Sequence, residues 1–125
     1  TKAYANAVEL SKIPGQQFCD QVGWKLSSMY LEIQRPDKIQ MFGGTIYRTI
    51  TPTTHCWYQN NNSGQHVWIE FSHSGAITVK TGIRVTTSPG TSFNTTALHP
   101  DPDYWNDKRV FSTNSAVCDY LLSIG

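Results

Sequence analysis

Histidine, carboxylate and cationic side chains share one side of a β-hairpin that the sequence predicts in the middle of the chain. The first strand alternates apolar and polar residues, which places His66, Trp68 and Glu70 together on one side. In the second strand, Lys80 and Arg84 fall on that same polar side. A histidine, a carboxylate and two cations on one rigid surface could form an acid/base site, an anion site or an ordinary polar surface. All three interpretations are open at this point.

The apolar residues set the register of this hairpin, whose turn is centred on Ser74-Gly75. A one-residue slip would move every apolar side chain to the wrong face, so the register must keep the apolar rows together. It predicts the cross-strand pairs Phe71–Ile77, Ile69–Val79 and Glu70–Thr78. The apolar row of the second strand is expected to contain Ile77, Val79, Ile83 and Val85.

A further strand before the Asn-rich loop is expected to pair with the first strand of the hairpin, setting His55 opposite Glu70 and Trp57 opposite Trp68. Two residues of this strand, Cys56 and Tyr58, then become buried. Glu70 could act as a general base and a histidine as the matching acid, while a cation holds a phosphate or an oxyanion. Cross-strand pairs of these types also stabilise sheets by about 0.2–1 kcal/mol each, so neither pair requires a catalytic role.

The tryptophans are the other candidates for ligand contact. Trp57 and Trp68, on the solvent-facing side of the hairpin, could stack on sugars or bases. A packing role explains both equally well. Trp24 is expected in the core, and Trp105 is expected to pin down a long loop.

Several common site classes have no motif in the sequence. The spacing of histidines and cysteines matches no closed zinc pattern. The chain has neither a phosphate-cradling glycine loop nor a Gly-x-Ser-x-Gly elbow. We therefore predict no metal and no cofactor. No apolar run approaches the ~20 residues of a transmembrane helix, so no membrane partner is predicted.

The composition is typical of a secreted β-rich domain. The chain has 125 residues, of which 15% are charged, and a formal net charge of +1 without a basic run. Binding a long phosphate backbone by charge alone is therefore unfavourable. Three cysteines allow one disulfide plus one thiol, and glycosylation sequons begin at Asn61 and Asn94. Together these features favour secretion through an oxidising compartment.

The hydrophobic pattern predicts one α+β domain, residues 18–125, after an N-terminal arm of residues 1–17. The arm holds a short helix from Asn6 to Lys12 and is expected to be a loosely docked terminus. Apolar residues at helical spacing predict the main helix from Asp20 to Gln34.

After Asp37 the pattern changes to strands. They are expected at residues 38–42, 45–50, 54–59, 65–71 and 76–86. Residues 88–107 are expected to form a long loop. A last hairpin, with its turn at Asn114-Ser115, is expected to pair residues 109–112 with residues 116–122.

The segment Asp107 to Leu122, DKRVFSTNSAVCDYLL, resembles the small fungal guanyl-type ribonucleases, the ribotoxins and the ribonuclease-like secreted effectors of plant-pathogenic fungi. That family carries an Arg-Val strand, a short turn and a hydrophobic strand near its C-terminus. The resemblance implies an N-terminal helix packed on a twisted antiparallel sheet. Phe18-Cys19 is similar to the aromatic–Cys signature of the effectors, which implies a disulfide between Cys19 and Cys118.

The resemblance gives Arg109 the position of the family's catalytic arginine and Glu70 that of its general base. The second catalytic histidine would fall near Ser123, and this chain has none there. His55 could stand for the earlier histidine, and His99 could replace the missing one only if the long loop folded over the sheet. The resemblance therefore implies a non-catalytic scaffold. If the chain were active, catalysis would rest on His55, Glu70, Arg84, Arg109 and His99.

Three functions follow as hypotheses. The first is a monomeric secreted effector that acts in virulence by binding a host protein, such as an immune receptor, or RNA. Its binding surface would consist of Trp57, His66, Trp68, Glu70, Lys80 and Arg84. The second is a secreted glycan-binding lectin or toxin subunit that uses Trp57, Trp68 and the Asn/Thr-rich loops. The third is an active small ribonuclease, against which the missing histidine argues.

Overall fold

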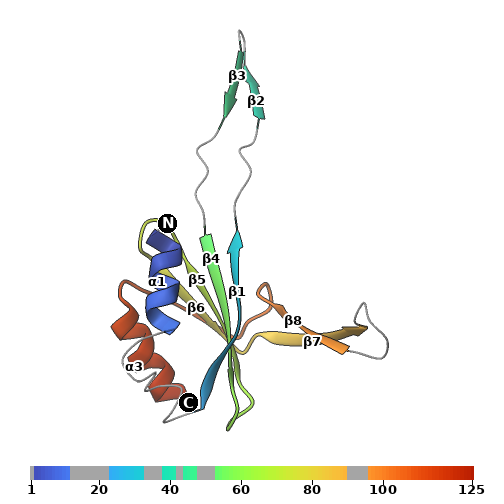
Figure 1. Cartoon of the computed structure of the whole chain (residues 1–125), viewed down its shortest axis with the longest axis vertical. Coiled ribbons are helices and arrows are strands. Elements are labelled where there is room, and N and C mark those ends of the chain that lie inside the picture. The colour runs from blue at the N-terminus through green and yellow to red at the C-terminus, as the bar shows by residue number, and fades with distance from the viewer. Residues whose placement is uncertain (1, 12–22, 33–37, 42–43, 48–52, 90–95) are drawn as a thin grey trace.

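A computed structural model describes residues 2–11, 23–32, 38–41, 44–47, 53–89 and 96–125 (Figure 1). Over these residues the fold is α+β, with two described helices and strands that pair in an antiparallel way. The helices are α1 (Lys2–Ser11) and α3 (Asn114–Ile124). The strands are β1 (Trp24–Glu32), β2 (Lys38–Met41), β3 (Gly44–Tyr47), β4 (Thr53–Asn60), β5 (His66–Phe71), β6 (Ile77–Thr81), β7 (Arg84–Pro89), β8 (Thr96–Asp101) and β9 (Asp107–Phe111).

Five strands form the central sheet, in the order β1-β4-β5-β6-β9. Two further antiparallel pairs, β2–β3 and β7–β8, lie outside it. Figure 1 shows β2–β3 beyond the ends of β1 and β4, and β7–β8 projecting away from the helices. The predicted registers are confirmed, both around the hairpin and between β4 and β5: Phe71–Ile77, Ile69–Val79, Glu70–Thr78, His55–Glu70 and Trp57–Trp68.

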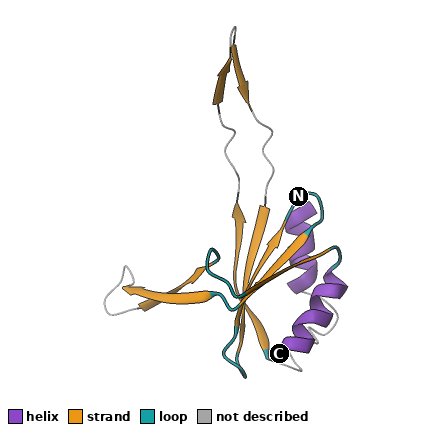
Figure 2. Ribbon diagram, turned by 180° about the vertical axis from the view of Figure 1, so that it is seen from behind, coloured by secondary structure: helices purple, strands orange, loops and turns teal. Residues whose placement is uncertain are grey.

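Both helices cover one face of the central sheet, as Figures 1 and 2 show from opposite sides. The sheet contributes the apolar residues that alternate along β4, β5 and β6, and Cys56 and Tyr58 are buried there as predicted. In α1, three fully buried residues recur at helical spacing: Ala3, Ala7 and Leu10. The small alanines let α1 approach the sheet closely. The arm predicted as loosely docked therefore adds to the core, while its boundary at residue 17 lies outside the described residues.

The helix predicted from Asp20 to Gln34 is wrong over Trp24–Glu32, which forms strand β1 along the whole of β4. A β-bulge between Leu26 and Ser28 explains the misleading spacing. The extra residue puts Leu26 and Met29 against the same core although they are three residues apart, which imitates a helical repeat. Trp24 is in the core as predicted, and its indole N–H donates to the backbone oxygen of Leu121 at 2.9 Å.

The predicted final hairpin is also wrong, because residues 116–122 belong to helix α3. The Asn114-Ser115 pair is the first turn of that helix rather than a β-turn. Thr113 is the N-cap, its hydroxyl accepting from the Ala116 backbone N–H at 3.2 Å. Val117 and Leu121, four residues apart, are both fully buried, so one stripe of α3 faces the sheet.

The segment expected as one strand over residues 76–86 divides at Gly82, whose φ of +68° favours glycine. This break sends Ile83 to the face opposite Ile77 and Val79, so the predicted four-residue apolar row is wrong at Ile83 and at Val85, which packs beside it. Part of the expected long loop is strand β8, which pairs with β7. None of the described helices is long and apolar enough to cross a membrane.

Candidate functional site

The sheet face away from the helices carries most of the predicted site residues. Trp57 and Trp68 lie on it, but they are only 4% and 6% exposed, and they pack with Ile83 and Val85 at the base of the β7–β8 hairpin. The expectation that these tryptophans face solvent is therefore wrong. The break at Gly82 is the reason, because it directs Ile83 onto the indole rings.

Each of these tryptophans is bonded to a histidine on the opposite strand. Trp57 donates its indole N–H to His66 Nδ1 at 3.1 Å, and Trp68 donates to His55 Nδ1 at 3.2 Å. The rings lie close, with centroids 5.7 Å and 5.4 Å apart respectively. A repeated His-x-Trp motif, at residues 55–57 and 66–68, is the sequence signal for this arrangement. Antiparallel pairing of Trp with Trp brings each histidine diagonally to the other strand's tryptophan.

These hydrogen bonds determine which ring nitrogen of each imidazole accepts. A ring nitrogen that accepts an N–H carries no proton, so Nδ1 is the acceptor atom in both rings. Burial lowers the pKa of His66 below its ordinary value, which favours its neutral form. Both histidines therefore act in the structure as acceptors that orient the tryptophans.

Glu70 forms an ion pair with Lys80, whose ammonium lies 3.0 Å from the carboxylate. The Lys80 side chain is only 14% exposed, and it also donates to the backbone oxygen of Pro102 at 3.2 Å. His55 Nδ1 lies 3.9 Å from the same carboxylate oxygen. This group joins β5 and β6 to the turn after β8, and it brings together three of the predicted site residues.

Arg84 belongs to a different cluster, at the start of β7. Its guanidinium lies 3.0 Å from the Asp101 carboxylate and 5.0 Å from the centre of the Tyr104 ring. The hydrogen bond from Arg84 is the main cause that lowers the pKa of Asp101 below its ordinary range. His99 is exposed on β8, where it stands opposite Thr86.

Arg109 lies on the opposite face of the sheet from Glu70. In the register, Glu70, Thr78 and Val110 form one cross-strand row, and side chains alternate between faces along a strand. Arg109, the neighbour of Val110, therefore points to the helix side, where its guanidinium lies 4.9 Å from the centre of the Tyr120 ring. Two residues that the family resemblance placed in one active site are thus separated by the sheet. Ser123, at the place of the missing histidine, lies in α3.

The turn between β8 and β9 presents two exposed aromatic side chains, one of which is Trp105, the residue expected to pin down the long loop. Tyr104 is 53% exposed and Trp105 is 40% exposed. A cation accompanies each ring: Arg84 lies over Tyr104, and Lys108 Nζ lies 5.6 Å from the centre of the Trp105 ring. We call this group of four residues, Arg84, Tyr104, Trp105 and Lys108, the aromatic turn.

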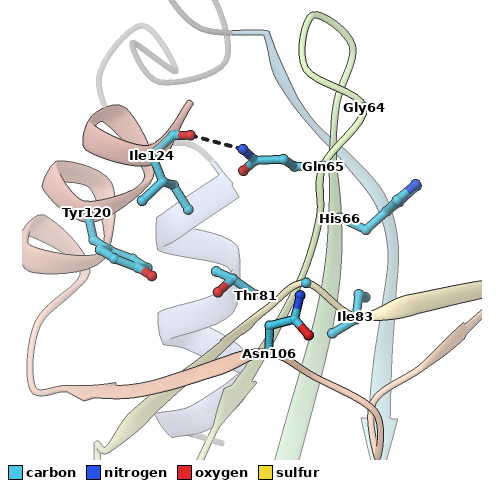
Figure 3. Close-up of a pocket in the computed structure, with 9 residues that line it drawn as sticks. Gly64, Gln65, His66, Thr81, Ile83, Asn106, Tyr120 and Ile124 are labelled. Carbon is cyan, nitrogen blue, oxygen red and sulfur yellow. Dashed lines mark hydrogen bonds between the residues drawn. The ribbon is translucent and has the colours of Figure 1, made fainter.

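A pocket of about 460 Å³ opens between the start of β5, the end of β6 and helix α3 (Figure 3). The figure shows Gln65, Thr81 and Tyr120 on the side of α3, and His66 on the other side of the strands. Its described lining is Gly64, Gln65, His66, Thr81, Gly82, Ile83, Asn106, Tyr120 and Ile124. No sequence pattern indicates this pocket, because its walls come from four separate segments.

The described cysteines, Cys56 and Cys118, do not belong to a cluster of possible metal ligands. Burial raises the pKa of the Cys56 thiol to about 12, so it stays protonated at neutral pH. Cys118 is 8% exposed on α3, and Cys19 lies outside the described residues, so their disulfide stays a prediction. Within the part of the chain that the structure describes, no group of three or more His, Cys, Asp or Glu residues could hold a metal ion.

Comparison of the chain with models of known protein families, with curated proteins and with solved structures finds no match. The functional conclusion therefore depends on the side chains of this chain alone.

Proposed function

We propose that this protein is a secreted, non-catalytic binding protein that recognises a partner protein through the aromatic turn. The observation that carries the proposal is the exposure of Tyr104 and Trp105 side by side, each accompanied by a cation. Trp, Tyr and Arg are the residues most enriched at the energetic centres of protein interfaces. Val110, 63% exposed on the adjacent edge strand β9, adds apolar area next to Lys108.

Binding explains the arrangement of the titratable groups better than catalysis does. General acid–base catalysis needs two groups on either side of one reacting atom. Here Glu70 is held by Lys80, the Nδ1 atoms of both sheet histidines accept indole N–H groups, and Arg109 lies on the other face. In these contacts the polar side chains bond to one another and hold the strands together, which supports a structural role for them on a binding protein.

A protein partner fits the charges of this surface better than RNA does. Arg84 is paired with Asp101, and Lys80 with Glu70, each at 3.0 Å. Phosphate binding depends on cations that can replace the counterions of a nucleic acid, and paired cations do so poorly. Lys108, which lies over Trp105, has no ion pair within the described residues.

The resemblance to ribonuclease-like effectors of plant-pathogenic fungi suggests a host protein, such as an immune receptor, as the partner. Residues 24–32 form a strand and residues 116–122 belong to a helix, which differs from the helix and the final strand that the sequence analysis expected there. Secretion is supported by the sequon at Asn61, which lies exposed in the turn between β4 and β5. Expression through a secretory pathway should therefore give a glycosylated chain whose mass falls on deglycosylation.

The aromatic turn can be tested with a candidate partner identified from a host extract and then purified. Trp105→Ala should weaken its binding by about 30-fold, the loss that follows when a central interface residue contributes about 2 kcal/mol. Tyr4→Ala is the matched control, since Tyr4 is 49% exposed on α1 and should leave the affinity unchanged.

Equal binding by the Trp105→Ala and wild-type proteins would overturn the assignment of this surface. A parallel titration uses a fluorescent single-stranded RNA oligonucleotide. Binding that is lost in both Trp105→Ala and Lys108→Ala but kept in Lys25→Ala, an exposed lysine on β1, would replace the protein partner with RNA.

A further inference from the structure

We infer that the pocket shown in Figure 3 binds a neutral saccharide, at a site distinct from the aromatic turn. Its volume of about 460 Å³ lies within the ~300–1,000 Å³ range of small-molecule sites. Trp57 and Trp68, on which the glycan-binding hypothesis relies, are buried. The pocket supplies a different surface for the same ligand chemistry.

The lining of the pocket is polar but neutral. Its described residues include two carboxamides and two hydroxyls, from Gln65, Asn106, Thr81 and Tyr120, and none of them is Asp, Glu, Lys or Arg. Carboxamides and hydroxyls can both donate and accept hydrogen bonds, and each hydroxyl of a sugar can do the same. A phosphate or carboxylate ligand would instead require a cation, and none is among these residues.

Several of these polar groups are available to a ligand. Gln65 donates from Nε2 to the Ile124 backbone oxygen at 3.2 Å, which orients its Oε1 as an acceptor. Tyr120 donates its hydroxyl hydrogen to Asp107 at 3.3 Å, so its oxygen can still accept. The side chains of Thr81 and Asn106 have no hydrogen bond to any described residue.

The rings around the pocket favour a saccharide over a nucleobase. Tyr120 is the only aromatic residue besides His66 among the described lining residues. The guanidinium of Arg109 occupies one face of the Tyr120 ring at 4.9 Å, and Phe111 packs against the same ring with centroids 5.4 Å apart. A base would need such a face for stacking. A sugar needs only the hydrogen-bonding groups.

The walls of the pocket are held in place before any ligand binds. The Asn106 backbone N–H donates to the Thr81 backbone oxygen at 2.9 Å, which ties the end of β6 to the start of β9. Gly82, at φ +68°, packs so closely that a Cβ there would lie 2.5 Å from Asn106 Nδ2. Preorganised polar groups lose little entropy on binding, which favours even a small ligand.

The structure contains its own reporter for this site. Trp57 bonds through its indole N–H to His66, which is among the lining residues and begins β5, although its ring points to the other side of the strands (Figure 3). We would record the indole N–H resonances of ¹⁵N-labelled protein during titration with methyl α-mannopyranoside, N-acetylglucosamine and galactose, and assign the Trp57 signal with Trp57→Phe. At least one sugar should shift the Trp57 signal in a saturable way.

Variants and a second ligand class decide between the outcomes. Asn106→Ala and Thr81→Val should abolish the shift, while Asn61→Ala, an exposed asparagine away from this pocket, should keep it. No shift with any sugar at tens of millimolar would overturn the inference, as would a shift that persists in both pocket variants. A shift caused by uridine or guanosine but by no sugar would also overturn it, in favour of a base site.

Discussion

Trp57 on β4 and Trp68 on β5 stand directly opposite each other, and each donates its indole N–H to the histidine two residues before the other tryptophan. This reciprocal arrangement links the two central strands of the sheet through side chains as well as through the backbone. It occurs on the face opposite α1 and α3, where the two tryptophans pack with Ile83 in a second, smaller core.

The burial of His66 predicts that the free energy of unfolding depends on pH. Because the folded-state pKa of His66 is lowered, the unfolded chain binds its proton more readily, and stability falls as the pH drops below about 6.5 and through the lower folded value. We expect His66→Gln, whose side chain can still accept the indole N–H, to show a shallower loss between about pH 7.5 and pH 5. Urea denaturation at several pH values measures this. His73→Gln, at an exposed turn, is the control and should follow the wild type; an unchanged slope in His66→Gln would contradict the prediction.

Because Ile69 lies in the core between the sheet and the helices, we predict that shortening its side chain strongly lowers the free energy of unfolding. This residue is fully buried, and its cross-strand neighbours are Cys56 and Val79. Ile69→Ala should lower the free energy of unfolding by about 2–4 kcal/mol, because it leaves a cavity. Lys25→Ala, on an exposed position of β1, should stay within about 0.5 kcal/mol of the wild type in the same denaturant melts. Similar losses in both variants would show that the faces are assigned wrongly.

We expect no RNA cleavage above background at neutral pH. Glu70 and Arg109 lie on opposite faces of the sheet, so they cannot act on one phosphate, and Ser123 offers no adequate acid. Incubation with a labelled RNA should give the same residual degradation for the wild type and for Glu70→Gln. Cleavage that disappears in Glu70→Gln or His99→Ala, but survives in Lys25→Ala, would establish an active ribonuclease.

The cysteines should differ in chemistry. Cys56 is fully buried with a raised pKa, so iodoacetamide should modify it slowly in the native protein and rapidly after unfolding. Cys19 and Cys118 should appear as one cross-linked peptide pair under non-reducing conditions. Detection of a Cys56–Cys118 linkage instead would refute this pairing.

The sequence alone determined the centre of the sheet. Strict alternation over β5 and β6 leaves one register that keeps Ile69 beside Val79, and the same logic places Trp57 opposite Trp68. These strands are neighbours in the chain, joined by short turns, so local pattern and tertiary pairing agree. A short N-terminal helix was predicted from Asn6 to Lys12; in the structure it begins at Lys2 and is described to Ser11, and its docking into the core was not predicted.

Only the tertiary structure decided the elements at the edges. A bulge gave β1 the apolar spacing of a helix, and pairing with β4 determined its conformation. At the C-terminus, the Thr113 cap and burial of Val117 and Leu121 against the sheet made residues 114–124 helical, although the same residues can alternate as a strand.

Pairing between strands that are distant in sequence also decided which side chains share one face of the sheet. Arg109 lies on the sheet face that is opposite to the face of Glu70. This placement follows from the pairing of β6 with β9, two strands that are separated in sequence by β7 and β8. A single positive φ at Gly82 turned Ile83 onto the tryptophans and so buried them. Periodicity records which side chains share a strand face, but it carries no information on which distant segment covers that face.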